Sequence, residues 1–200
     1  LMLDRPAEAE PVAVAVPAAA ALPTAVNGTP MPSLAPMLKR VLPAVVSVNT
    51  KQRVRVNTPF GDDPVFRRMF GIPQERIAQS LGSGVIVDAA RGLILTNNHV
   101  VEDADEVSVT LADGRTLKAE FVGNDADTDI ALMRIPTRSL TGAPLTEIPV
   151  ANSDRLQIGD FVVAVGNPFG VGQTVTSGIV SAVGRNNLPG AGFQNFIQTD

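Results

Sequence analysis

The 200-residue sequence contains no cysteine, tryptophan or tyrosine, and it has a single histidine. Without cysteine there is no disulfide framework, no thiolate nucleophile and no cysteine-based zinc site. There is no excess of basic residues, and the net charge of -4 gives no indication of nucleic-acid binding. No apolar run reaches the roughly 18 to 20 residues that a membrane-spanning helix requires, since Pro17 interrupts the nearest candidate at residues 12–22.

The start of the chain has a biased composition. Residues 5–36 are mostly Ala, Pro and Val, with few charges. Because proline removes a backbone donor and interrupts both helices and sheet interiors, residues 1–36 are predicted to form a disordered or extended tether. A short amphipathic helix is predicted next over residues 34–42, with Ser33 as its N-cap and Pro43 as its end.

The rest of the sequence has the pattern of many short strands. Residues 44–49 are predicted to form the first strand, and eight strand-like segments follow at 84–87, 93–96, 107–111, 117–122, 130–135, 161–165, 175–183 and 196–198. Turn signals separate them, and residues 112–115 predict a hairpin turn. No helical pattern of crossover length intervenes, so the fold class is predicted to be all-β, an antiparallel barrel or sandwich.

Two segments without a strand pattern divide this region. Residues 136–149 are rich in Ser, Thr, Gly and Pro. We place the boundary between two β units in this segment, so that the units span 37–140 and 141–200. The second unit is too short for a closed barrel. Residues 52–80 hold exposed aromatic residues and mixed charge. Because loops of this length are usually functional or disordered, a regulatory or assembly loop is predicted here, with a surface helix over 63–70 as the alternative.

The only histidine, His99, follows the apolar run at residues 93–95. A lone histidine is equally consistent with a structural imidazole in a core. As a general base it needs an acceptor on one ring nitrogen and a nucleophile or water at the other. Four acidic residues are close in sequence but lie in a polar loop that is expected to face water: Glu102, Asp103, Asp105 and Glu106. Asp129 instead adjoins the apolar strand at 130–133, and the cost of burying an unpaired carboxylate favours His99 as its partner.

Metal and phosphate sites are poorly supported. Asp125, Asp127 and Asp129 alternate, which suggests a calcium loop, but the central glycine and terminal glutamate of an EF-hand are missing. A zinc site would have one histidine and otherwise only carboxylates. The glycine-rich stretches at 82–84 and 166–170 lack the lysine and the helix that follow a phosphate loop. The sequence therefore predicts neither a metal nor an organic cofactor.

Several blocks of sequence together carry a family resemblance. They are Ser83-Gly84-Val85-Ile86-Val87, Thr96-Asn97-Asn98-His99-Val100-Val101, Asp127-Thr128-Asp129-Ile130-Ala131-Leu132, and the stretches at 159–170, 176–181 and 196–200. In this order, and over most of residues 44–200, they resemble the HtrA family of serine proteases, in its DegP/DegQ branch. The resemblance implies a trypsin-like double antiparallel β-barrel, with the second barrel incomplete in this chain.

The resemblance also implies roles for individual residues. His99 matches the family's general base and Asp129 its orienting acid, in the chain order of chymotrypsin-like enzymes. Residues 52–80 fall where the family has its first regulatory loop, which mediates oligomer contacts. Residues 184–195 match the loop that senses allosteric signals, and Arg185 matches the arginine that relays them.

The nucleophile is the point of departure from the family pattern. The family's serine lies in a Gly-Asn-Ser-Gly-Gly motif shortly after Gln-Thr-Asp, and Gln198-Thr199-Asp200 are the last residues here. None of the serines present matches that motif, because four of them lie in other blocks of the family pattern: Ser83, Ser153, Ser177 and Ser181. We therefore expect a piece of a longer protein that is inactive by itself, with the oxyanion-hole amides and peptide-binding PDZ domains beyond residue 200.

As a function, the resemblance implies a serine endopeptidase of the bacterial periplasm that degrades unfolded or misfolded proteins. It also implies a chaperone-like holding activity and a homo-oligomer, a trimer or larger. No cofactor, no nucleic acid and no integral membrane segment are expected. The alternative is a non-catalytic β-domain that binds unfolded proteins or assembles with full-length subunits, with His99 structural. A metal-binding envelope protein is a third hypothesis.

Overall fold

The computed structural model describes residues 25–26, 29–30, 33–56, 68–69, 75–138, 140–167, 172–185 and 196–200. The chain divides into two compact units, Leu1–Leu34 and Ala35–Asp200. In the first unit, strands β1 (Ala25–Val26) and β2 (Thr29–Pro30) pair antiparallel. Most of the predicted tether, residues 1–36, lies outside the described residues.

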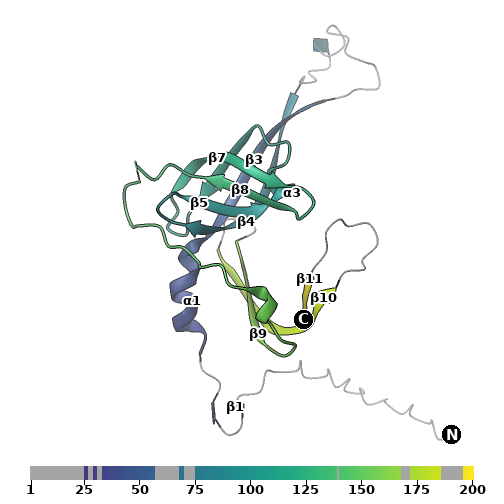
Figure 1. Ribbon diagram of the computed structural model, residues 1–200. Coiled ribbons are helices and arrows are strands. Elements are labelled where there is room, and N and C mark those ends of the chain that lie inside the picture. The colour runs from purple at the N-terminus through teal and green to yellow at the C-terminus, as the bar shows by residue number, and fades with distance from the viewer. Residues whose placement is uncertain are drawn as a thin grey trace, which may run out of the picture. The chain divides into compact units, whose positions relative to one another are not determined.

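Helix α1 (Ala35–Val41) opens the second unit and runs into the 3-10 turn η1 (Leu42–Ala44) (Figure 1). These bounds agree with the helix predicted over 34–42, except that Pro43 lies within the 3-10 turn rather than ending the helix. No residue of α1 is buried. Among the described residues, no helix is long and apolar enough to cross a membrane.

Six strands then form a closed barrel in the order β3-β4-β5-β8-β7-β6, and β3 pairs with β6 to complete it. Every neighbouring pair is antiparallel. The strands are β3 (Val45–Arg55), β4 (Glu75–Asp88), β5 (Leu93–Asn97), β6 (Glu106–Thr110), β7 (Thr116–Asp125) and β8 (Ile130–Arg134).

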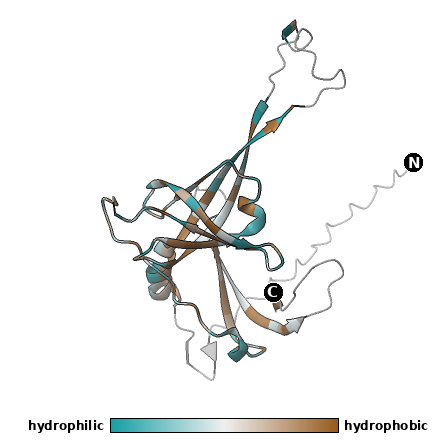
Figure 2. Ribbon diagram, turned by 45° about the horizontal axis from the view of Figure 1, so that its top comes forward, coloured by the Kyte–Doolittle hydropathy of each residue, from teal (hydrophilic) through white to brown (hydrophobic). Residues whose placement is uncertain are grey.

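The barrel closes around an apolar core. Alternate residues of each strand point inward, and the most deeply buried are aliphatic or Met side chains: Val46, Val48, Ile86, Ile94, Val109 and Met133. Figure 2 shows how apolar residues recur along these strands. The β6–β7 hairpin predicted at residues 112–115 is present, with Thr110 opposite Thr116 and Gly114 at a φ of 89°. A left-handed φ of this kind favours glycine.

The structure corrects one boundary. β3 and β4 pair continuously from Val45 opposite Val85 to Arg55 opposite Glu75, so residues 52–55 and 75–80 are strand and not loop. The charged composition of this stretch suggested a loop, but backbone ladder bonds do not depend on side-chain polarity. Arg68 and Met69 are helical and exposed. The rest of the helix predicted over 63–70 lies outside the described residues.

A second sheet follows the barrel, with the order β11-β10-β9. Its strands are β9 (Phe161–Gly166), β10 (Thr174–Arg185) and β11 (Phe196–Thr199), and the short turn η2 (Ser153–Arg155) precedes them. Both neighbouring pairs are antiparallel. A closed barrel with a partial second sheet confirms the predicted all-β class.

Buried polar bonds join the second sheet to the barrel. Ser47 Oγ donates to the Asn167 carbonyl over 2.9 Å, and the Asn167 amide donates to Ser83 Oγ over 2.8 Å. The segment between the two β units is also held to the barrel, because the Arg115 guanidinium donates to the Thr141 and Ala143 carbonyls. The second sheet is therefore attached to β3 and β4 of the barrel.

Candidate active site

His99 lies at the junction of a strand and a single helical turn. β5 ends at Asn97, whose ψ of 145° is still extended, and helix α3 (Asn98–Val101) begins at the next residue. The Glu102 amide donates to the Asn98 carbonyl and closes the turn. Val100 and Val101 are buried in the core, while the His99 side chain is 69% exposed. The turn thus anchors its apolar residues and presents the imidazole to solvent.

Asp129 lies in the turn between β7 and β8. Asp125 pairs with Ile130 across this hairpin, and Asp129 has a φ of 54°. Few residues other than glycine adopt such a left-handed backbone, but aspartate and asparagine tolerate it. The turn lies beside the start of α3, because the Asn98 amide donates to the Asp129 carbonyl over 3.0 Å.

The two predicted residues, thirty positions apart, form a direct pair. His99 Nδ1 lies 2.7 Å from Asp129 Oδ2, and the His99 backbone amide donates to Oδ1 over 2.9 Å. The side-chain amide of Asn97 donates to Oδ2 over 3.0 Å. The carboxylate therefore has hydrogen-bond partners on both oxygens, supplied by two residues of the β5–α3 junction, Asn97 and His99.

These bonds set the charge of the pair. The His99 backbone amide holds the pKa of Asp129 below its usual value of 3.8, with further lowering by the His99 ring and Asn97 against an opposing desolvation effect. Asp129 is thus ionised at neutral pH and can only accept hydrogen bonds. His99 Nδ1 must then carry the ring proton, which leaves the Nε2 lone pair free to accept a proton from a substrate or a nucleophile.

The other acidic candidates do not contribute to this pair. Asp105 accepts the Arg53 backbone amide, and Asp125 accepts the Asp127 amide within its own turn. Glu102 and Asp103 are exposed. In the described part of the chain, no group of three or more Asp, Glu or His side chains is arranged to hold a metal ion.

Arg185 is at the end of β10, where its backbone is opposite Phe196. Its side chain lies outside the described part of the structure. The sequence reasoning missed Asn97, which contacts the carboxylate, and Asn98, whose Oδ1 accepts from Asn124 Nδ2 over 2.6 Å. Two adjacent asparagines before the only histidine were the available signal, but asparagine is common in turns and at helix starts.

Comparisons with known proteins agree with this geometry. A family model described as a trypsin-like peptidase domain matches residues 82–200. The periplasmic pH-dependent serine endoprotease DegQ of Escherichia coli K12 is 50% identical over 175 residues, which are 86% of this chain and 37% of that protein. This chain belongs to the HtrA family of trypsin-like serine proteases.

Other HtrA proteins extend the comparison to structure. The solved HtrA-type protease AlgW with a decapeptide has a TM-score of 0.64 and 44% identity, over 84% of this chain and 51% of that one. The periplasmic serine endoprotease DegP of Escherichia coli K12 is 45% identical over an alignment of 208 positions, gaps included, that covers 91% of this chain and 43% of that protein. The chain spans about two fifths of these curated relatives, and the predicted HtrA resemblance and trypsin-like fold are confirmed.

Proposed function

We infer that this chain supplies the general base and the orienting acid of a serine endopeptidase. The observation that carries this inference is the 2.7 Å contact between His99 Nδ1 and Asp129 Oδ2, with a second carboxylate oxygen held by the His99 amide. A structural histidine in a core would be buried, whereas this imidazole is 69% exposed. The ring is therefore oriented by protein and accessible to a reactant.

In the reaction, His99 Nε2 takes the proton of a serine hydroxyl as that oxygen attacks the carbonyl carbon of a peptide bond. Asp129 keeps the imidazole oriented and stabilises the imidazolium that forms. Backbone amides stabilise the oxyanion, and the imidazolium returns the proton to the leaving amine as the peptide C–N bond breaks. Water, deprotonated by His99, then hydrolyses the acyl-serine and regenerates the serine hydroxyl. No metal or organic cofactor takes part in these steps.

The serine and the oxyanion amides come from the family's Gly-Asn-Ser-Gly-Gly motif, which none of the serines in residues 1–200 matches. Within the described residues, no serine hydroxyl is hydrogen-bonded to His99. We therefore expect that these 200 residues by themselves do not turn over protein substrates.

The names of related proteins support the proposed protein substrate and the proposed periplasmic location. Curated relatives are named periplasmic serine endoproteases, and solved neighbours were determined with a decapeptide or a tripeptide. We propose a periplasmic enzyme that degrades unfolded or misfolded proteins, has a holding activity and forms trimers or larger assemblies. Arg185 and the segment between β3 and β4 are its proposed regulatory parts, and the boundary at residue 140 and the downstream PDZ domains belong to the same proposal.

One observation favours a second function. The three-stranded sheet leaves large apolar side chains exposed: Phe161, Ile179, Val183, Phe196 and Ile197. Phe161 and Ile179 are cross-strand partners and lie on one face of the sheet, and contiguous exposed apolar surface marks interaction sites. A non-catalytic chain that holds unfolded proteins, or assembles with full-length subunits through this sheet, would use them.

Hydrolysis of unfolded casein tests the proposal. The full-length protein should cleave casein, and His99→Ala should lower kcat by about 10⁶-fold, as loss of a triad histidine does. Asp125→Asn, in the same hairpin as Asp129, should leave kcat unchanged. Full activity in His99→Ala refutes the proposed base. Casein turnover by residues 1–200 alone refutes the absence of a nucleophile.

A further inference from the structure

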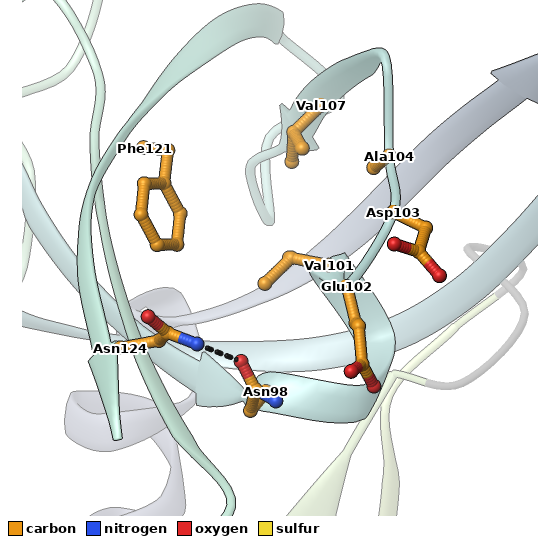
Figure 3. A pocket seen from close by; sticks show the side chains of 8 residues that line it. All are labelled: Asn98, Val101, Glu102, Asp103, Ala104, Val107, Phe121 and Asn124. Carbon is orange, nitrogen blue, oxygen red and sulfur yellow. Dashed lines mark hydrogen bonds between the residues drawn. The ribbon is translucent and has the colours of Figure 1, made fainter. Parts of the chain in front are cut away.

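A pocket of about 390 Å³ lies beside the histidine-bearing turn. Figure 3 shows Phe121 and Asn124 of β7 along one side of it and Ala104 and Val107 along the other. Val101, from α3, lies between them. The proposed catalytic mechanism uses none of these side chains.

The body of the pocket is apolar. Val101 and Val107 are 7% and 8% exposed and belong to the barrel core, and Ala104 packs against it. Phe121 is different, because 57% of this large aromatic side chain is exposed. The pocket therefore has a rigid aliphatic floor and an aromatic wall that still has free surface to bury.

Two carboxylates, those of Glu102 and Asp103, complete the lining. In the described part of the chain, neither forms an ion pair or a side-chain hydrogen bond, whereas the nearby Asp105 accepts a backbone amide. Their negative charge is thus uncompensated beside an apolar surface. That combination complements a cation at the end of an aliphatic stem.

We propose that this pocket is a subsite for a lysine or arginine side chain of a bound polypeptide. Its volume is near the lower limit for ligand pockets, which suits one side chain better than a cofactor. The methylene stem would pack on Val101 and Phe121, and the ammonium or guanidinium would face Glu102 and Asp103.

Asn98 connects the pocket to the candidate active site. Its side chain lines the pocket and accepts from Asn124, while its backbone amide donates to the Asp129 carbonyl (Figure 3). Helix α3 therefore contributes His99 to the candidate active site and Val101 to the pocket. As a substrate preference the inference rests on the proposed peptidase function; as a binding site it stands independently of cleavage.

Binding is measured by NMR on the ¹⁵N-labelled 200-residue chain, titrated separately with the Nα-acetyl amides of lysine, arginine and norleucine. Norleucine has the same aliphatic stem as lysine without its charge. At low ionic strength we expect the lysine and arginine amides to bind about 5- to 10-fold more tightly than the norleucine amide. Because salt screens exposed charges, about 0.3 M salt should reduce this ratio. Amide shifts should concentrate at residues 101–107 and 121–124.

Matched variants isolate the charge. The double variant Glu102→Gln, Asp103→Asn should bind all three probes alike, and Phe121→Ala should weaken all three. The control, Glu106→Gln with Asp154→Asn, removes the same net charge from exposed positions outside this pocket and should behave as the parent chain.

Equal binding of lysine and norleucine amides to the parent chain overturns the proposal, as does cation binding that survives in the Glu102→Gln, Asp103→Asn variant. Absence of binding by all probes overturns it too. Selective cation binding by a protein whose full-length form fails to cleave casein would refute the peptidase while leaving the subsite intact. Casein cleavage by a protein that does not bind the cationic amides selectively would refute the subsite and leave the peptidase function standing.

Discussion

Asn97 and His99 donate to the same carboxylate oxygen. Asn97 Nδ2 lies 3.0 Å from Asp129 Oδ2, and His99 Nδ1 lies 2.7 Å from it. Because a carboxylate oxygen has two lone pairs, both donors can be satisfied at once. Asn97 therefore restricts rotation of the carboxylate and keeps one lone pair directed at the imidazole.

Replacement of Asn97 by alanine should expose this role. Without the side-chain amide, the lowered pKa of Asp129 should rise towards its usual value, since one hydrogen bond to the charged form is lost. We expect a stability loss of about 1 kcal/mol, the usual contribution of such a bond at a partly exposed site. Carboxyl ¹³C NMR titration and urea unfolding measure the two effects. Asn152→Ala, which removes a side-chain cap at η2, should leave the Asp129 pKa unchanged.

The imidazole tautomer gives a second prediction. Because ionised Asp129 accepts from the ring, the neutral imidazole should carry its proton on Nδ1. His99 is the only histidine, so its two ring ¹⁵N resonances are identified without assignment. Asp129→Asn should shift the ring towards the Nε2–H tautomer, and Asp125→Asn should not. A neutral parent ring protonated on Nε2 would contradict the geometry.

The stability of the fold at acid pH should depend on the protonation of three carboxylates. The pKa values of Asp88, Asp113 and Asp129 lie below 3.8, lowered mainly by the Arg91 backbone amide at the first and the Arg115 side chain at the second. A group whose pKa falls on folding contributes stability that is present above its unfolded pKa and lost as pH falls through the folded pKa. The urea midpoint should therefore decrease below about pH 4.

The Asp88→Asn, Asp113→Asn double variant separates these contributions from the general effect of acid. Its urea midpoint should be lower than that of the parent chain at pH 7. The midpoint should also fall less between about pH 4 and pH 2, because two of the three carboxylates that lose hydrogen bonds on protonation are absent. Parallel curves for the two proteins would show that these carboxylates do not titrate with unfolding.

Gly82 provides a test of packing under the active site. A Cβ at this position would lie 2.7 Å from both methyl carbons of Val100, the buried residue that follows His99. Gly82→Ala should destabilise the fold by about 1 to 3 kcal/mol, the usual cost of overpacking, and should displace α3. Urea unfolding and the His99 ring resonances report both changes. Gly123→Ala, where nothing lies within 4 Å of the new Cβ, is the control and should be near neutral.

Much of the fold was predictable because local pattern and tertiary contact agree. Alternating β-branched residues such as Val46 and Val48 face the core in β3, and the turn at residues 112–115 joins β6 to β7 as predicted. The pairing of His99 with Asp129 was also predictable, since of the three alternating aspartates Asp125, Asp127 and Asp129 only the last adjoins the apolar strand at 130–133. The alternation of apolar and polar residues predicts only an antiparallel barrel or sandwich, and the family resemblance added the trypsin-like fold.

The sequence by itself determined the strands, the lone histidine and its acidic partner, since these depend on residue type and period along the chain. Only the tertiary structure decided that Asn97 shares an oxygen with His99, that Asn98 meets Asn124, and that Phe121, Glu102 and Asp103 line one pocket. It also extended β3 and β4 through residues of charged composition. The physical reason is that these contacts join residues from separate strands, turns and helix α3, and their distances follow from barrel closure, which no local pattern encodes.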